Sequence, residues 1–89
     1  MAVLNFPNAS RSYDQRQRRV RFWAHDAALE IPFFLDAAAL LFINPMTAVD
    51  EAGLLKTFDI NRGAIESAAA RVYRRHARGS YILMASDFA

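Results

Sequence analysis

The chain has 89 residues, of which 54% are apolar, 12% aromatic and 22% charged, and its formal net charge is +2. This length holds one core and is too short for two, and the apolar content excludes a compositionally disordered chain. Cysteine is absent, which excludes a disulfide framework, a thiol nucleophile and a zinc–thiolate site. We therefore expect residues 1–89 to form a single domain that is held together by packing of its core.

The segment Met1 to Asn8 has neither the basic start nor the long apolar stretch of a secretory signal. The most apolar stretch, residues 31–43, contains Pro32 and Asp36 and is shorter than the roughly 20 residues that a membrane-spanning helix requires. The lack of cysteine agrees with a reducing compartment. These features predict a cytoplasmic protein whose most apolar stretch belongs to the core.

Residues 1–18 mix one short apolar piece, Val3 to Phe6, with proline, asparagine, serine and charged residues. We expect a partly irregular N-terminal arm in which Val3 to Phe6 is a candidate edge strand. Two runs of alternating residues follow at 19–25 and 29–35, and this period of two is typical of half-buried strands. The segment His25 to Ala27 between the runs suits a hairpin loop.

Helical patterns follow the hairpin. Asp36 suits the N-cap of a short helix at Ala37 to Ile43, and Thr47 or the acidic pair Asp50 and Glu51 opens the next helix. The expected apolar stripe of this second helix is Val49, Ala52, Leu55 and Phe58.

The clearest helical pattern runs from Arg62 to about Ala77, and Gly79 follows it as a natural terminating residue. The apolar stripe of this third helix is Ile65, Ala68, Ala69, Val72, Tyr73 and His76. A last strand is expected from Ser80 to Ser86. Both faces of this strand are apolar, which favours a central or doubly covered position in the sheet.

The expected order of elements is β-β-α-α-α-β, which indicates an α+β fold. The hairpin and the C-terminal strand form a small antiparallel sheet in this prediction, with Val3 to Phe6 as an additional edge, and the sheet packs on two or three helices. One face of such a sheet stays uncovered. The strand order is open, because Val3 to Phe6 could instead pair beside the last strand.

Short elements spread over almost the whole chain resemble one family. They are Leu4 to Asn8, Val20 to Phe22, Ala38 to Leu40, Phe58, Asn61, Arg62, Ile65, Tyr73, Gly79 to Tyr81, Asp87 and Phe88. In these elements the chain resembles the short bacterial proteins of domain-of-unknown-function family 1488. The resemblance implies a compact bacterial α+β domain and brings with it no activity, ligand or catalytic residue. The segment His25 to Ala27 departs from expectation because it lacks a hairpin glycine.

Charge is strongly segregated along the chain. Residues 11–21 hold five arginines against Asp14, a local charge of +4, and residues 71–78 hold four arginines without an acid, again +4. The rest of the chain therefore carries −6. Ten of the eleven basic residues are arginine, whose planar guanidinium suits phosphate and carboxylate. Two interpretations stay open: the arginines are solvated or paired with acids, or they bind an anionic partner.

The candidate nucleic-acid contacts come from both arginine clusters. They are Arg16, Arg18, Arg19, Arg21, Arg71, Arg74, Arg75 and Arg78. If the two clusters met beside Trp23 and Tyr81, they would form the kind of basic and aromatic surface that binds single-stranded nucleic acid.

Trp23 and Phe34 alternate away from the apolar faces of their strands, so we expect both on the uncovered side of the sheet. With Tyr81 they form a candidate protein interface, for a homodimer or for another protein. The alternative is that the N-terminal arm or a twist of the sheet covers them within the monomer.

The sequence offers little for catalysis. His25 and Asp26 are neighbours, but adjacent residues of a strand point to opposite faces. Two histidines without cysteine do not make a zinc site, and the three glycines are isolated rather than grouped in a phosphate-binding loop. We therefore expect no catalytic, cofactor-binding or metal-binding residue and no small-molecule substrate. The leading hypothesis is a small non-catalytic domain that acts through protein contacts or self-association, and the alternative is a nucleic-acid-binding accessory protein.

Overall fold

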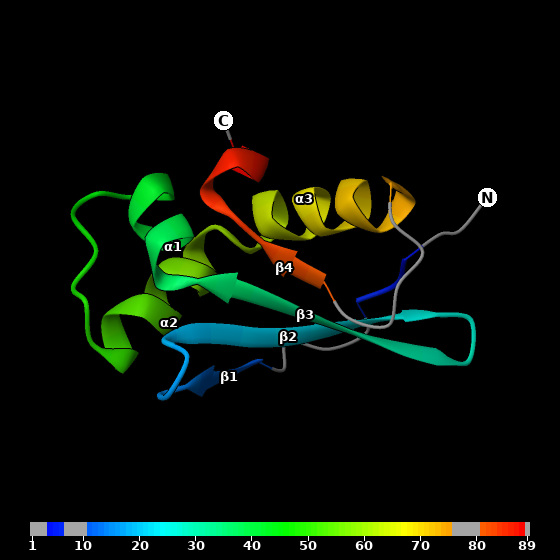
Figure 1. Ribbon diagram of the computed structural model, residues 1–89, viewed down its shortest axis with the longest axis horizontal. Coiled ribbons are helices and arrows are strands. Elements are labelled where there is room, and N and C mark those ends of the chain that lie inside the picture. The colour runs from blue at the N-terminus through cyan, green and yellow to red at the C-terminus, as the bar shows by residue number, and fades with distance from the viewer. Residues whose placement is uncertain (1–3, 7–10, 76–80, 89) are drawn as a thin grey trace.

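The computed structural model describes residues 4–6, 11–75 and 81–88 (Figure 1). Its elements are β1 (Arg11–Asp14), β2 (Arg19–Asp26), β3 (Leu29–Asp36), α1 (Ala37–Ile43), α2 (Glu51–Ile60), α3 (Arg62–Arg75), β4 (Tyr81–Leu83) and the 3-10 turn η1 (Ala85–Phe88). The α+β class with three helices is confirmed. The observed order is β-β-β-α-α-α-β, one strand more than the sequence predicts.

The four strands form one sheet in the order β1-β2-β3-β4. The pairs β1–β2 and β2–β3 are antiparallel, whereas β4 runs parallel to β3. The prediction of a purely antiparallel sheet is therefore wrong in this detail. The physical reason is the connection: the chain leaves β3 through the three helices and returns beside it in the same direction, as a helical crossover allows.

The last strand is shorter and less protected than the prediction has it. β4 covers only Tyr81–Leu83 and lies at an edge of the sheet, so the expected central position is wrong. Its second apolar face is exposed, since Ile82 is 49% and Met84 55% accessible. The apolar residues on the second side of this segment therefore lie at the protein surface.

The N-terminal arm contains a strand that its composition does not reveal. β1 pairs with β2 over Arg11–Asp14, a segment without apolar alternation. In the predicted edge strand at Val3 to Phe6, the described residues 4–6 form a single antiparallel bridge, in which Asn5 and His25 exchange backbone hydrogen bonds of 2.8 and 2.7 Å. Within the described residues 4–6, this segment therefore pairs with β2 rather than with β4.

Two turns of the sheet contain a left-handed residue that is not glycine. The strands of the β2–β3 hairpin run to Asp26 and Leu29, so its turn is Ala27 and Ala28, with Ala27 at φ 54°. The β1–β2 turn ends on Arg18, at φ 52°. Asp14 Oδ1 stabilises this second turn, because it accepts hydrogen bonds from the backbone N–H groups of Arg16 and Gln17 at 3.0 and 3.2 Å.

One face of the sheet packs against the helices and forms the core. Phe22 and Phe33 stack with their ring centroids 5.4 Å apart, and Phe58 of α2 and Tyr81 of β4 contact this pair at 5.1 and 5.4 Å. The predicted stripe of α3 is confirmed at Ile65, Ala68, Ala69 and Val72, with Tyr73 half-buried, whereas His76 lies outside the described residues.

The second helix begins later than its predicted stripe assumes. Asp50 is the N-cap and its side chain accepts a 2.7 Å hydrogen bond from the N–H of Gly53, so Val49 lies before the helix and is exposed. Of the predicted stripe, Phe58 is buried, Leu55 is half-buried and Ala52 is exposed. The other buried residues of α2 are Leu54 and Thr57. Asp36 precedes α1 as predicted, although its carboxylate makes no capping hydrogen bond. No helix in the described part of the chain is long and apolar enough to cross a bilayer.

Candidate functional site

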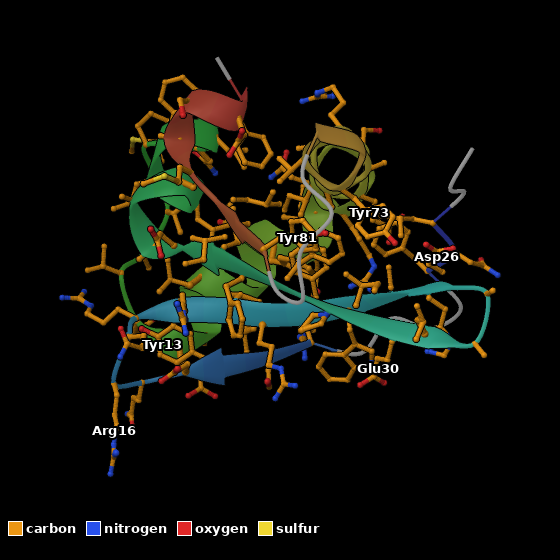
Figure 2. All side chains as sticks on the ribbon, turned by 45° about the vertical axis from the view of Figure 1, so that its right-hand side comes forward. Tyr13, Arg16, Asp26, Glu30, Tyr73 and Tyr81 are labelled. Atoms are coloured by element: carbon orange, nitrogen blue, oxygen red, sulfur yellow. The ribbon has the colours of Figure 1, made fainter. Side chains whose placement is uncertain are left out.

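The candidate site is the face of the sheet that points away from the helices, which we call the open face. Alternate residues of the two long strands point to it, because their neighbours fill the core. From β2 these residues are Arg19, Arg21, Trp23 and His25, and from β3 they are Glu30, Pro32, Phe34 and Asp36. Figure 2 shows the two sides of the sheet, with Glu30 below the strands and Tyr81 among the side chains above them.

The register of the two strands arranges these residues in four rows across the sheet. Residues directly opposite in an antiparallel pair share a face and lie close together. The rows are Arg19 with Asp36, Arg21 with Phe34, Trp23 with Pro32, and His25 with Glu30. The open face of β2 therefore carries the basic side chains and that of β3 carries the carboxylates, with the aromatic rings in the two middle rows.

Each aromatic ring of the open face lies beside an arginine. The guanidinium carbon of Arg19 lies 4.0 Å from the centre of the Phe34 ring, and that of Arg21 lies 5.5 Å from the centre of the Trp23 ring. Such cation–π contacts stabilise by about 0.5–1 kcal/mol at exposed sites. They hold both rings half-buried on a surface that no described helix covers.

The apolar centre of the open face continues onto β4. Ile82 pairs in register with Phe34 and is half exposed. One row therefore carries Arg21, Phe34 and Ile82 side by side on three strands. Contiguous exposed apolar groups of this kind mark interaction surfaces more often than scattered single residues do.

Arg19 is only partly neutralised by its own chain. Its Nε lies 3.8 Å from Asp14 Oδ2, which is an ion-pair distance but too long for a hydrogen bond, and this Nε has no hydrogen-bond acceptor among the described residues. The other oxygen of Asp14 is occupied by the backbone of the β1–β2 turn. The Nε atom itself is buried, and 21% of the Arg19 side chain is exposed on this surface.

The structure separates the residues of the predicted interface. Trp23 and Phe34 both lie on the open face, as their alternation predicts. Tyr81 does not join them: it pairs in register with Phe33, is 3% exposed and belongs to the core. Ile82 takes its place on this surface.

The described members of the two arginine clusters do not form one surface. Arg16 and Arg18 are exposed in the β1–β2 turn, which precedes the first residue of β2, and Arg16 extends away from the molecule in Figure 2. Arg71 on α3 belongs to the helical layer, where its Nη2 donates a 3.0 Å hydrogen bond to the backbone oxygen of Asp87. Arg74 and Arg75 belong to the last turn of the same helix, and Arg78 lies outside the described residues.

A hydrogen bond near the end of α3 shows which end of the sheet this part of the helix approaches. The Tyr73 hydroxyl donates a hydrogen bond to Asp26 Oδ2, at the last residue of β2 (Figure 2). The end of α3 therefore lies at the opposite end of β2 from Arg18, a separation of about 25 Å for eight residues of strand.

The pKa of Tyr73 is raised to about 12, mainly by this hydrogen bond to the Asp26 carboxylate and secondly by desolvation of the phenol. A phenol held protonated in this way is a structural donor and not a base. His25 lies beside Asp26 in sequence but opposite Glu30 on the open face, so the two neighbours do not form an oriented pair. In the described part of the chain, no three histidine or acidic side chains gather as a metal site.

The sequence analysis did not single out Glu30, Asp36 or Ile82 as site residues. The alternation of each strand places all three on the open face. Their grouping depends on the pairing register, which a single strand pattern does not contain.

These features define a two-layer α+β domain with an aromatic sheet face that no described helix covers. The family model described as "Protein of unknown function (DUF1488)" matches residues 4–83, and the chain belongs to this family. Searches of the curated proteins and of the solved structures found no match.

Proposed function

We propose that this protein is a small, non-catalytic cytoplasmic domain that acts by binding another protein through the open face. The row of Arg21, Phe34 and Ile82 supports the proposal most directly. Together with Trp23 in the neighbouring row, it spreads over three strands on the side opposite the helices. Aromatic and arginine side chains are enriched at protein interfaces, because they combine large apolar area with directional polar contacts.

The balance of charge on the open face favours a protein over a polyanion. Glu30 and Asp36 stand in the same rows as the basic side chains of β2. A phosphate chain laid on this surface would meet both carboxylates, whereas a protein surface can present groups of both signs.

Two of the described arginines pair with carboxylates of their own chain. Arg11 donates two hydrogen bonds to the Asp59 carboxylate, at 3.0 and 2.9 Å, and Arg62 pairs with Glu66 at 2.9 Å. The first contact connects β1 to α2 and the second lies within α3, and both reduce the number of arginines available to phosphate.

Nucleic-acid binding is the second candidate function. The exposed Arg16 and Arg18 adjoin the end of β2 where Arg19 and Arg21 flank the aromatic rings. An aromatic sheet surface beside basic residues is the arrangement on which single-stranded bases stack.

Two measurements test the proposal. First, acrylamide should quench Trp23 readily in dilute protein, although less than in the unfolded chain, because the ring is half-buried on the open face. A strongly shielded Trp23 would show that the chain covers its own face, which would overturn the proposal.

The second measurement is fluorescence anisotropy of labelled single-stranded and duplex oligonucleotides over a series of salt concentrations. We expect no saturable binding at physiological salt. Micromolar binding that weakens steeply with salt and is lost in Trp23→Ala would replace the protein-contact function by nucleic-acid binding.

A further inference from the structure

We propose that the partner of the open face is a second copy of this chain, packed face to face about a two-fold axis that runs parallel to the strands between β2 and β3. This inference rests on the proposed function and names its partner. The side chains of the four rows make the open face complementary to itself.

The symmetry operation determines which residues meet. A two-fold axis parallel to the strands keeps every row at its own level and exchanges the two strands, so β2 of one copy lies over β3 of the other. Packed sheets lie about 10 Å apart with a rotation of about 30° from their twist, which keeps these strands within side-chain reach. An interface of this type is isologous, so each contact occurs twice.

The outer rows then place polar groups of the two copies opposite each other. Arg19 of one copy faces Asp36 of the other at one end, and His25 faces Glu30 at the other end. Arg19 presents the exposed 21% of its side chain to this contact, while its Nε stays buried within its own chain. The carboxylate of Asp36 is available as well, since it makes no capping hydrogen bond to α1.

The middle rows supply the apolar centre. Arg21 faces Phe34 of the second copy, and Trp23 faces Pro32. The planar guanidinium of arginine stacks on aromatic rings, and a tryptophan ring packs well against proline. The contact therefore has an aromatic centre and charged ends, as protein interfaces do.

The charges also select this axis over the other two-fold arrangement. An axis across the strands would place β2 over β2 and β3 over β3, reversed end to end. Arg19 would then face His25, and Asp36 would face Glu30. The carboxylates of Asp36 and Glu30 would meet at both ends, which costs free energy in a desolvated interface.

The experiment is a charge-exchange test read by sedimentation equilibrium from low micromolar to millimolar concentration. The wild-type chain should show twice its monomer mass at the upper concentrations. Arg19→Glu alone and Asp36→Arg alone should each weaken dimerisation by about tenfold or more, because each places like charges in two symmetric contacts.

An equimolar mixture of the two variants should regain the dimer mass. In the mixed dimer, the carboxylate introduced at position 19 of one chain faces the guanidinium introduced at position 36 of the other, and the second contact keeps its native pair. Intrachain neighbours cannot produce this recovery, because each chain of the mixture carries only one change. Arg16→Glu changes the charge by the same amount in the exposed β1–β2 turn and should leave the dimer unaffected.

Circular dichroism checks that each variant folds. If one of them does not, His25→Glu alone should weaken the dimer because it faces Glu30, and its mixture with Glu30→Arg should restore the dimer. A wild-type chain that stays monomeric at millimolar concentration would overturn the second-copy inference but not the proposed function, provided that Trp23 is accessible. A dimer that both variants leave unchanged, or that their mixture does not restore, would equally overturn the proposed arrangement.

Discussion

Arg19 and Phe34 belong to neighbouring strands, and the guanidinium carbon of Arg19 lies 4.0 Å from the centre of the Phe34 ring. The two residues are diagonal neighbours, because Arg21 is the residue directly opposite Phe34 in the register. This contact covers part of the ring without removing it from the surface. Phe34 therefore belongs to the open face, whereas Phe33, the preceding residue, is fully buried.

This difference predicts opposite consequences for two adjacent phenylalanines. In dilute protein, Phe33→Ala should lower the free energy of unfolding by about 3–5 kcal/mol, because it leaves a cavity between Phe22 and Tyr81. Phe34→Ala should cost about 1 kcal/mol, mainly through the lost cation–π contact. Urea unfolding measures both values. Equal losses at the two positions would show that Phe34 is part of the core and would contradict the assignment of the open face.

The hydrogen bond from Tyr73 to Asp26 predicts a loss of stability in alkali. The pKa of Tyr73 is raised from 10.0 to about 12 in the folded protein, so folding favours the protonated phenol. The stabilisation is fully present below pH 10, the unfolded value, and disappears as the pH rises through about 12. Melting temperatures measured over this range should fall less in Tyr73→Phe than in the wild-type chain. Tyr13→Phe is the control and should keep the wild-type slope; an unchanged slope in Tyr73→Phe would refute the role of this bond.

The conformation of the hairpin turn predicts that glycine at position 27 stabilises the protein. Ala27 adopts φ 54°, a left-handed conformation that is unfavourable for residues with a Cβ atom. Ala27→Gly should therefore raise the free energy of unfolding by about 0.5–1 kcal/mol. Ala28→Gly is the matched control, because Ala28 has no positive φ, and it should give no gain. Thermal unfolding of the two variants decides the matter, and a gain at Ala28 alone would contradict the turn geometry.

The sequence predicted the parts of the fold that follow from periodic patterns. The alternation from Arg19 onward specified both long strands and the side on which Trp23 and Phe34 lie, and the spacing of Ile65, Ala68 and Val72 specified the inner stripe of α3. These patterns are local, and the packing of one sheet face against helices enforces them.

The parts that sequence reasoning missed depend on pairing between distant segments. β1 has no apolar alternation, and its position follows from its register with β2 and from the Arg11 contact with Asp59 of α2. The parallel direction of β4 and the burial of Tyr81 depend on where the three helices return the chain. The rows of the open face also depend on pairing between separate segments, because Arg19 and Asp36 are 17 positions apart and meet only through the register.

The two helical glycines of the described chain predict effects of opposite sign. Alanine usually stabilises a helix relative to glycine by about 0.5–1 kcal/mol, because it loses less backbone entropy on folding. Gly63, in the first turn of α3, has no atom within 4 Å of the position of an added Cβ, so Gly63→Ala should show this gain.

At Gly53 of α2, an added Cβ would lie far inside van der Waals contact with the backbone oxygen of Ala48. The loop before α2 must move away to accept it, and the Asp50 cap that accepts a hydrogen bond from the Gly53 N–H lies in the same segment. Gly53→Ala should therefore destabilise the protein despite the higher helix propensity of alanine, by about 1–3 kcal/mol for an overpacked site. Chemical unfolding of the two variants compares them directly. A gain in stability at Gly53 equal to that at Gly63 would show that the loop from Thr47 to Asp50 does not pack closely against α2.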